Sequence, residues 1–407
     1  NNNPANPVIN TRSYGEDPHE VARLGVSFIH GLQDNGMIAT AKHFPGHGDT
    51  ETNSHLALPI VNVSRARLDT VELVPFRAAI KAGVGAVMTF HGSMPALDSS
   101  GAPGTLSSNV VTGLLRKELG FNGLVISDAM DMKGVTDKYG STEAVKRAVA
   151  AGVDVLIQPL DVPAAIDAVV AGVNEGRYSD VRVSEAARRI LAMKRKLSLD
   201  RDRFANLDSL RATVGDSAHV ALAQQAADRS ITVVRDASHL LPLKFGASTK
   251  VLSVAVARRT DLGAGQVFNA ALAKLAPATR TEFVMSDDPA VNYPRLEAMA
   301  DSADVTIVSS YVGQSWNVTT VDAPQAFADW LGRLVAKGRK VIVVSFGNPY
   351  LLSQIPSVPT YVVAWDGANA SQQSAAQVIA GLLPASGHLP ITIPPVAKRG
   401  DGLTITP

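Results

Sequence analysis

Short apolar runs alternate with amphipathic stretches through the first half of the chain. Four runs have the length and composition of buried strands, and each is followed by a stretch with helical periodicity. Strands separated by helices of this length predict βαβ units and a parallel sheet. The four predicted strands are MIATAKHF (37–44), GAVMTFH (85–91), GLVISD (123–128) and VDVLIQP (153–159).

The helical stretches between these strands carry apolar residues on one face. Val21, Leu24, Phe28 and Leu32 mark the first, which Asn35-Gly36 should close. Ser64 is a suitable N-terminal cap for the next. The further helices are predicted at 64–81, 110–119, 141–151, 162–175 and 184–197.

The second half repeats the rhythm with continuous apolar runs, which indicate a sheet covered on both faces. We expect a smaller doubly wound α/β sandwich domain over 216–407, joined by a polar linker at 198–215 to a first domain at 1–200. It contains no GxGxxG fingerprint after its first strand and no Walker lysine, so nucleotide binding is not supported. Its strands are predicted at 231–234, 251–256, 305–310, 341–346 and 361–364.

Polar side chains follow each strand of the first half. Lys42 and His43 end the first strand, His91 the second, Asp128 the third and Gln158 the fourth. In a (β/α)8 barrel of the TIM type the active site is built from these carboxyl ends. Four strands are half of such a barrel, and the chain opens on loop-like residues. We therefore expect a barrel domain whose N-terminal strands are missing from this chain.

Composition limits the classes of partner. The 407 residues carry a formal net charge of +1, which gives no global electrostatic case for nucleic acid or an anionic membrane. There is no cysteine, so disulfides and thiol nucleophiles are excluded. No stretch of about 18 apolar residues is available to span a bilayer, and no signal peptide is visible. None of these features sets the oligomeric state.

The loop KHFPGHGDTETNSH (42–55) concentrates titratable groups. His43 and His47 have the spacing of a helical metal pair, but Pro45, Gly46 and Gly48 exclude a helix there. Glycines let a backbone approach a ligand closely, so we interpret the loop as catalytic or ligand-binding. A purely structural loop and a metal site are the alternatives.

Two further positions carry chemistry. Asp128 stands just past a buried strand, where a parallel strand delivers it to the site, whereas Asp131 more plausibly caps or pairs with the following segment. Arg12 lies in a loop punctuated by Gly and Pro. Its guanidinium is either solvated or donates a pair of hydrogen bonds to sugar hydroxyls or to a carboxylate.

Several long motifs resemble glycoside hydrolase family 3, with the β-N-acetylglucosaminidases as the most similar branch. The resemblance is strong over residues 1–160 and weaker beyond, and it implies a retaining hydrolase with a covalent glycosyl-enzyme. The motifs are RSYGEDP, KHFPGHGDTETNSHLALP, PALDSSGAPGTLS, ELGFNGLVISDAMDM and, near the end, SGHLPITIP.

The resemblance also implies roles for single residues. Asp128 matches the nucleophile and His55 the general acid/base, while Arg12, Lys42 and His43 match residues that hold the non-reducing sugar. We expect no metal and no cofactor, and a small saccharide as the partner. His91 and Met130 are further candidates for contact with the substrate.

One position departs from the family branch, where an aspartate precedes the histidine by two residues. Here the triplet is Asn53-Ser54-His55. Asparagine can set the histidine tautomer but cannot stabilise imidazolium. The enzyme is then slow, or Asp49 or Glu51 supplies the charge, or the asparagine is engineered.

Competing functions remain open on the sequence alone. A β-glucosidase or a β-glycoside phosphorylase would use the same scaffold. A metal-dependent amidohydrolase barrel also gathers Lys, His and Asp at strand ends, and loss of catalysis would leave a sugar-binding protein. For the leading reading we expect cell-wall fragments as substrates and a bacterial protein of the cell envelope or the medium.

Overall fold

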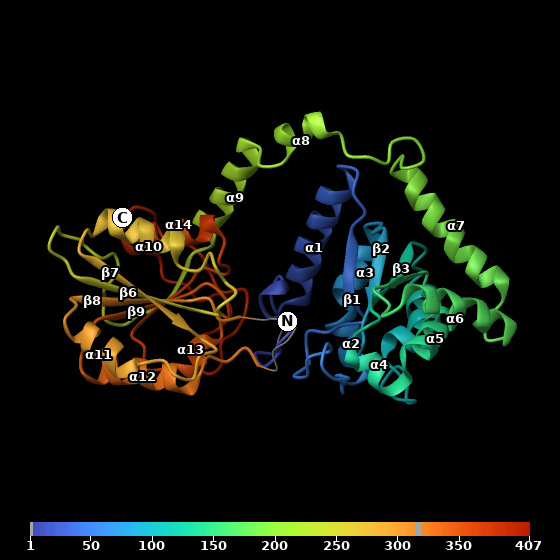
Figure 1. The fold of residues 1–407 in the computed structure, drawn as a ribbon, viewed down its shortest axis with the longest axis horizontal. Helices are drawn as coiled ribbons and strands as arrows, with labels where there is room; N and C mark the ends of the chain where they lie inside the picture. The colour runs from blue at the N-terminus through green and yellow to red at the C-terminus, as the bar shows by residue number, and fades with distance from the viewer. Residues whose placement is uncertain (1–2, 314–319) are drawn as a thin grey trace. The chain divides into compact units, whose positions relative to one another are not determined.

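The computed structural model describes residues 3–313 and 320–407. The described residues fall into two compact units, which meet in sequence between Ala205 and Asn206. Each unit has its own sheet, drawn in Figure 1. The domain bounds 1–200 and 216–407 stay a prediction.

The first unit is built on a four-stranded parallel sheet in the order β1-β2-β3-β4. Its strands are β1 (Thr40–Phe44), β2 (Ala86–Thr89), β3 (Leu124–Ala129) and β4 (Val155–Ile157). Because neighbouring strands are parallel and in sequence order, all four carboxyl ends lie along one edge of the sheet. This is the barrel-type arrangement expected from the sequence.

Helices follow the strands and bury their apolar faces on the sheet. Phe44 of β1 is fully buried and meets Phe76 edge to face, with ring centroids 5.2 Å apart. The helical elements are η1 (Asn10–Arg12), α1 (Pro18–Gln33), α2 (Arg65–Thr70), α3 (Leu73–Lys81), η2 (Gly104–Leu106), the π-helix η3 (Asn109–Glu118), α4 (Lys133–Tyr139), α5 (Ser141–Ala151), α6 (Val162–Asn174) and α7 (Asp180–Lys196).

The helix predicted at 64–81 is two helices, α2 and α3, with a break at Val71. Ser64 caps the first as expected, because its hydroxyl accepts from the Arg67 N–H. Pro75 explains the break: it has no N–H for the Val71 carbonyl, yet a proline fits the first turn of a new helix.

The second unit holds a six-stranded sheet in the order β5-β10-β9-β8-β6-β7. All neighbours are parallel except β5, which runs antiparallel to β10 at one edge. Its strands are β5 (Thr232–Asp236), β6 (Val251–Ala257), β7 (Thr279–Met285), β8 (Val305–Ser310), β9 (Val341–Ser345) and β10 (Thr360–Val363).

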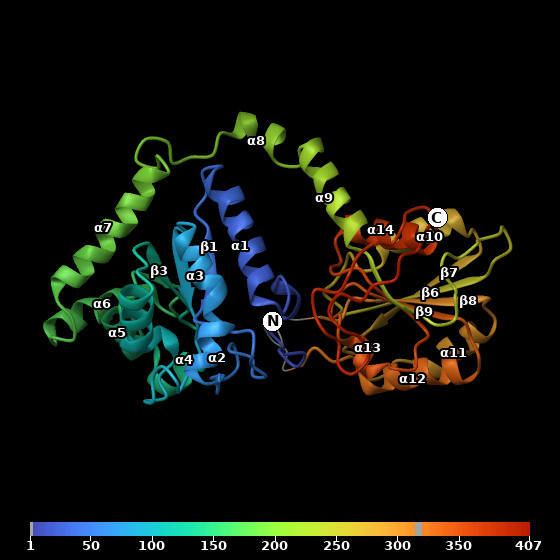
Figure 2. The same cartoon turned by 180° about the vertical axis from the view of Figure 1, so that it is seen from behind.

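Helices cover both faces of this sheet, as a doubly wound fold requires (Figure 2). One apolar cluster packs α10 (Gln266–Leu275) and α14 (Asn369–Ile379) on the sheet. Another packs α11 (Tyr293–Asp301), α12 (Gln325–Ala336) and α13 (Leu351–Gln354). Two helices precede the sheet, α8 (Leu207–Thr213) and α9 (Ser217–Ser230), so the predicted linker 198–215 is not irregular throughout. No helix in the described part of the chain is long and apolar enough to cross a bilayer.

A buried carboxylate braces the amino ends of the strands, on the edge opposite Asp128. Asp154 precedes β4, and its side chain is fully buried. One oxygen accepts from Arg116 at 2.6 Å and from the Val125 N–H at 3.0 Å; the other accepts from Arg182 at 3.2 Å and Arg189 at 3.1 Å. One anion therefore ties η3, β3, β4 and α7 together.

Substituting asparagine for Asp154 is expected to lower the free energy of unfolding of the first unit by about 3–5 kcal/mol. The change leaves three arginines around a neutral amide that has lost one acceptor oxygen. Urea denaturation followed by far-UV circular dichroism measures the loss. Asp167→Asn, an exposed change on α6, is the matched control, with an expected effect below about 0.5 kcal/mol. Equal stability of the two variants would contradict the bracing role.

Candidate active site

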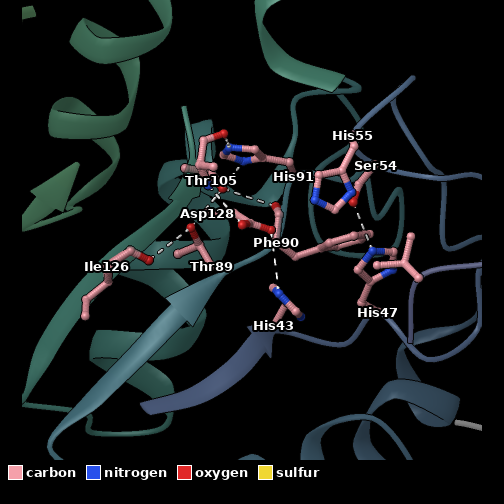
Figure 3. Close-up of polar contacts among 12 residues, drawn as sticks. His43, His47, Ser54, His55, Thr89, Phe90, His91, Thr105, Ile126 and Asp128 are labelled. Carbon is pink, nitrogen blue, oxygen red and sulfur yellow. Dashed lines mark hydrogen bonds and ion pairs between the residues drawn. The ribbon is translucent and has the colours of Figure 1, made fainter. Parts of the chain in front are cut away.

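The site lies where β1, β2 and β3 end. Lys42 and His43 are the third and fourth residues of β1, and Asp128 is the fifth residue of β3. The Nε2 atom of His43 is 3.7 Å from Oδ2 of Asp128. Figure 3 shows His43, His55 and His91 gathered around Asp128. The parallel sheet thus brings together residues 85 positions apart in the chain, as the strand-end pattern predicted.

The loop after β1 is folded around a buried imidazole. Nδ1 of His47 is 2.9 Å from the Thr50 hydroxyl, and Nε2 is 3.1 Å from the Ser54 hydroxyl. The ring also packs on Phe90, with centroids 4.2 Å apart. From outside the loop, the Asn6 amide donates to the His47 carbonyl at 2.7 Å. His47 therefore holds Ser54, the neighbour of His55, in place.

Burial of His47 makes the stability of the fold sensitive to acid. Desolvation, followed by the charge of Arg12, lowers its pKa to about 3 from 6.5. Between these values the unfolded chain binds a proton that the folded chain does not. The contribution of His47 to stability is therefore complete above pH 6.5 and is lost as the pH falls, by about 1.4 kcal/mol per pH unit.

His47→Gln is accordingly expected to be less stable at pH 7 but to lose less stability between pH 6.5 and pH 4.5 than the unsubstituted protein. Urea denaturation at a series of pH values gives the slope, since the glutamine cannot titrate. His19→Gln, at an exposed position of α1, is the matched control and should keep the original slope. The account of His47 fails if both variants have the same pH dependence.

His55 is held by the amide of Asn53. The Asn53 Oδ1 atom lies 2.9 Å from the backbone N–H of His55 and 2.9 Å from its Nδ1. A backbone N–H can only donate, so the atom facing it is the amide oxygen rather than the nitrogen. Nδ1 must then carry a proton to donate to the same oxygen. In neutral His55 the lone pair is on Nε2, which leaves that nitrogen available as a base.

The charges around His55 oppose one another. Burial has the largest effect and lowers its pKa; Asp128 and Asp131 raise the pKa, and Arg12 lowers it. Asp131 itself accepts a hydrogen bond from the Gln158 amide at 2.8 Å. The net lowering means that imidazolium, the form able to donate from Nε2, is disfavoured at neutral pH.

Asp49 does not contact His55. It is 3.6 Å from Arg67 and accepts from the Asn3 amide at 3.3 Å. Arg67 also pairs with Glu72, at 3.2 Å. These contacts fasten the outer side of the loop to α2. Asp49 is one of the two loop carboxylates considered as a source of negative charge for His55. Its side chain pairs with Arg67 and Asn3 instead.

A cavity of about 340 Å³ opens beside β1. Its lining includes Arg12, Lys42, His43 and His47, the carboxylates Glu16 and Glu72, and apolar side chains of α1 and α3. Burial and the charge of Arg12 lower the pKa of Lys42, while Asp128 raises it. Burial has the largest effect on His43 and lowers its pKa well below 6.5, so this imidazole is neutral at neutral pH. The lining therefore combines two cations and a neutral donor with two carboxylates.

Two family models match this chain. One described as the glycosyl hydrolase family 3 N terminal domain covers residues 1–193, and one described as the family 3 C-terminal domain covers 205–403. A solved family 3 β-N-acetylglucosaminidase from Paenibacillus sp. str. FPU-7 is 33% identical, with a TM-score of 0.84, over 97% of this chain and 74% of that one. The chain belongs to glycosyl hydrolase family 3.

Other proteins are similar at lower identity. A β-N-acetylglucosaminidase/β-glucosidase from Cellulomonas fimi is 29% identical over 95% of this chain and 71% of that protein. A solved β-glucoside phosphorylase is 28% identical with a TM-score of 0.85, over 96% of this chain and 72% of that one. Family membership makes this protein a glycoside hydrolase with a saccharide as substrate, so the metal-dependent amidohydrolase is not retained. Among the described residues, no three His, Asp or Glu side chains are arranged to hold a metal.

Two candidates for substrate contact, His91 and Met130, are buried: His91 fully, and Met130 to within 1%. Neither is among the residues that line the cavity, and the same holds for Asp128 and His55. Substrate contact by His91 and Met130 stays a prediction. Met130 packs in the apolar core of the first unit, and its N–H bonds the Ile157 carbonyl at 2.8 Å. Both ring nitrogens of His91 are occupied, by the Thr105 hydroxyl and the Ala129 carbonyl. The chain turns back into the core at both strand ends, which strand alternation does not reveal.

Sequence reasoning missed the hydroxyl residues that support these side chains. Thr50, Ser54, Thr89 and Thr105 all contact imidazoles or one another within the first unit. Their only signal in the sequence was position, because each lies inside or beside a motif that also holds a histidine or glycines.

Proposed function

We propose that this protein is a retaining exo-β-N-acetylglucosaminidase that releases terminal β-linked N-acetylglucosamine through a covalent glycosyl-enzyme on Asp128. The observation that carries the proposal is the pairing of His55 with Asn53 beside a carboxylate at the end of β3. A loop histidine with a fixed tautomer suits proton transfer to and from the glycosidic oxygen.

The proposed reaction has two steps, formation and hydrolysis of the glycosyl-enzyme. A carboxylate oxygen of Asp128 bonds to the anomeric carbon while the glycosidic C–O bond breaks and imidazolium His55 gives its Nε2 proton to the leaving oxygen. Neutral His55 then takes a proton from water, whose oxygen attacks the same carbon and frees Asp128. Two inversions retain the β configuration. A neutral base also avoids the repulsion that a second carboxylate would exert on Asp128.

Arg12, Lys42 and His43 are proposed to hold the non-reducing sugar. They line the cavity, and charged donors suit sugar hydroxyls. Arg12→Ala or Lys42→Ala is expected to lower kcat/KM by about 10- to 100-fold, mainly through KM, because a charged hydrogen bond is lost. Lys81→Ala, an exposed change at the end of α3, is the control. A shift of the pH profile in Lys42→Ala, with KM unchanged, would contradict the binding role.

The substrate class is tested with a panel of aryl β-glycosides. We expect kcat/KM to be highest for the N-acetylglucosaminide, with the glucoside second. The relatives support this order, since one is a β-N-acetylglucosaminidase and another carries both activities in its name. Retention is checked by proton NMR of the first-formed sugar. A strong preference for the glucoside, or an inverted product, would overturn the proposal.

A second candidate is a β-glycoside phosphorylase, in which phosphate replaces water in the second step. Two observations favour it: the similarity to a solved β-glucoside phosphorylase, and the two cations, Arg12 and Lys42, in the lining of the cavity. Turnover with and without phosphate separates the candidates. Accumulation of a sugar 1-phosphate, with a rate that rises with phosphate, would assign the phosphorylase.

For the natural substrate we propose bacterial cell-wall fragments that begin with N-acetylglucosamine. The support is the bacterial origin of the similar proteins from Cellulomonas and Paenibacillus. Incubation with muropeptide disaccharides should release free N-acetylglucosamine. Hydrolysis of chitooligosaccharides alone would redirect the proposal to chitin.

A further inference from the structure

A chain of four polar groups lies behind Asp128. The Thr89 and Thr105 hydroxyls are 2.8 Å apart, and the Thr105 hydroxyl is 2.7 Å from Nδ1 of His91. Nε2 of His91 is 2.9 Å from the Ala129 carbonyl. All three side chains are fully buried, and Figure 3 shows His91 and Thr105 on the other side of Asp128 from His43, with Thr89 beside it. None of them is used by the mechanism above.

The direction of this chain follows from its last member. A carbonyl only accepts, so Nε2 of His91 carries the proton that bonds Ala129. Burial lowers the pKa of His91, more than Asp128 raises it, so the ring is neutral and Nδ1 is a lone pair. The Thr105 hydroxyl then donates to Nδ1 at 2.7 Å, in preference to the Phe90 carbonyl at 3.2 Å, and accepts from Thr89. The Thr89 hydroxyl has the Ile126 carbonyl as a longer alternative acceptor, at 3.4 Å. The chain ends on the backbone next to Asp128.

That backbone lacks regular ladder support. The register between β3 and β4 shifts between Ile126 and Ala129. Within the shift, the Ile157 N–H bonds the Ser127 hydroxyl at 2.9 Å in place of a strand carbonyl. Side chains therefore supplement the interrupted ladder on both sides of Asp128: Ser127 toward β4, where the ladder resumes at Ala129 and Ile157, and His91 toward β2.

The backbone of Ala129 connects this support to the carboxylate through two successive peptide groups. The Ala129 N–H donates to Oδ1 of Asp128 at 2.9 Å, and the Ala129 carbonyl, in the next peptide group, accepts from Nε2 of His91 at 2.9 Å. Oδ2 is the oxygen that faces His43, at 3.7 Å. Fixing Ala129 thus fixes which carboxylate oxygen is occupied and which is presented to the site.

We propose that His91, oriented by Thr105, is a positioning residue for Asp128: by binding the Ala129 carbonyl it holds the backbone of Ala129 so that the Ala129 N–H binds Oδ1 and leaves Oδ2 aimed at the anomeric carbon. The inference rests on the proposed role of Asp128 as nucleophile. Attack on carbon needs a defined line of approach, and a displacement of about 1 Å costs about 10²-fold in rate.

The test is the rate of covalent inactivation by a fluorinated glycoside with a dinitrophenyl leaving group, which needs no proton donor. Thr105→Val removes the hydroxyl that orients His91 while keeping the side-chain shape. We expect its inactivation rate constant to fall by about 10²-fold, with the affinity for the inhibitor unchanged. Thr105→Ser should restore the rate to within a few-fold of the unsubstituted protein.

Thr112→Val is the matched control, since the Thr112 hydroxyl, on η3, donates to the carbonyl of Ala151 at the end of α5, away from the site. A second pair of variants, His91→Gln and His91→Ala, tests the inference if Thr105→Val does not fold. Glutamine keeps an N–H donor for the Ala129 carbonyl and alanine does not. The inactivation rate constant should therefore be higher for His91→Gln than for His91→Ala. All rates are expressed per folded molecule, from circular dichroism and denaturation of each variant.

Two outcomes overturn the inference. One is an unchanged inactivation rate in Thr105→Val and in both His91 variants; the other is weaker inhibitor binding at an unchanged rate constant, which would mark His91 as a substrate contact. These are distinct from failure of the proposed function. In that case the unsubstituted protein itself would be labelled at a residue other than Asp128.

Discussion

Asp128→Ala is expected to lower kcat by about 10⁴- to 10⁶-fold, the range for loss of a covalent nucleophile. No covalent intermediate can then form, while the fold should persist, because the Asp128 side chain is partly exposed and its one short hydrogen bond is to the adjacent peptide. Steady-state kinetics with an aryl β-N-acetylglucosaminide measures the loss. Asp137→Asn, an exposed carboxylate change on α4, is the control and should retain full activity.

Azide sharpens this prediction. In Asp128→Ala a small anion can occupy the space of the carboxylate and attack an activated substrate directly. The expected product is a glycosyl azide of inverted configuration, since only one displacement occurs. Normal turnover in Asp128→Ala, or rescue by azide with retained configuration, would show that the nucleophile lies elsewhere.

His55→Ala is expected to lower kcat/KM on unactivated β-glycosides by about 10²- to 10⁴-fold, the usual contribution of a general acid/base. Dinitrophenyl glycosides should lose far less in the first step, because their leaving group departs without protonation. Their second step still needs a base for water, so the glycosyl-enzyme should accumulate. His30→Ala, an exposed change on α1, serves as the control. Full activity of His55→Ala on unactivated substrates would move the acid to another residue.

The tautomer of His55 makes a specific prediction for Asn53. In the resting site the Nδ1 proton points at the Asn53 oxygen, and the low pKa disfavours the proton on Nε2 that the first step needs. Asn53→Asp would place an anion at this position and raise the pKa of His55. We expect kcat to rise on substrates with poor leaving groups and to change little on activated ones.

The pKa of His55 also sets the pH dependence of kcat/KM. With the pKa of His55 below 6.5, kcat/KM on unactivated substrates should fall as the pH rises through that lowered value, because imidazolium is lost. Activated substrates should lack this basic limb, and Asn53→Asp should move it to higher pH. If Asn53→Asp is without effect while Glu51→Gln is severely impaired, that carboxylate supports His55 instead.

Much of the site follows from one sequence rule. Apolar runs that end in Lys42, His43 and Asp128 predicted a parallel sheet with polar groups at its carboxyl edge, and the structure has this arrangement. The rule depends only on strand polarity, so it needs no knowledge of loops. It could not tell that His91, one residue beyond an apolar run, turns inward to bond Ala129.

Other features were invisible for identifiable reasons. Strand β7 (Thr279–Met285) begins with four polar residues and has one buried position, because it lies at the edge of its sheet, so no long apolar run marked it. The break before α3 was not predicted because the pattern over 64–81 is that of one continuous helix. Pro75, in the first turn of α3, was the signal for a second helix. The hydroxyl chain behind Asp128 joins Thr89 to Thr105 across 16 residues, a pairing that only the folded loops create.

The most direct test of the account is the site of covalent labelling. A fluorinated activated β-glycoside, whose fluorine slows both steps and the second more, should trap the glycosyl-enzyme in the intact protein. Proteolysis and tandem mass spectrometry should then find one sugar per chain, on the peptide that contains Asp128 and on that carboxylate. A label on any other side chain, or turnover with no trapped intermediate at any concentration, would contradict the central claim.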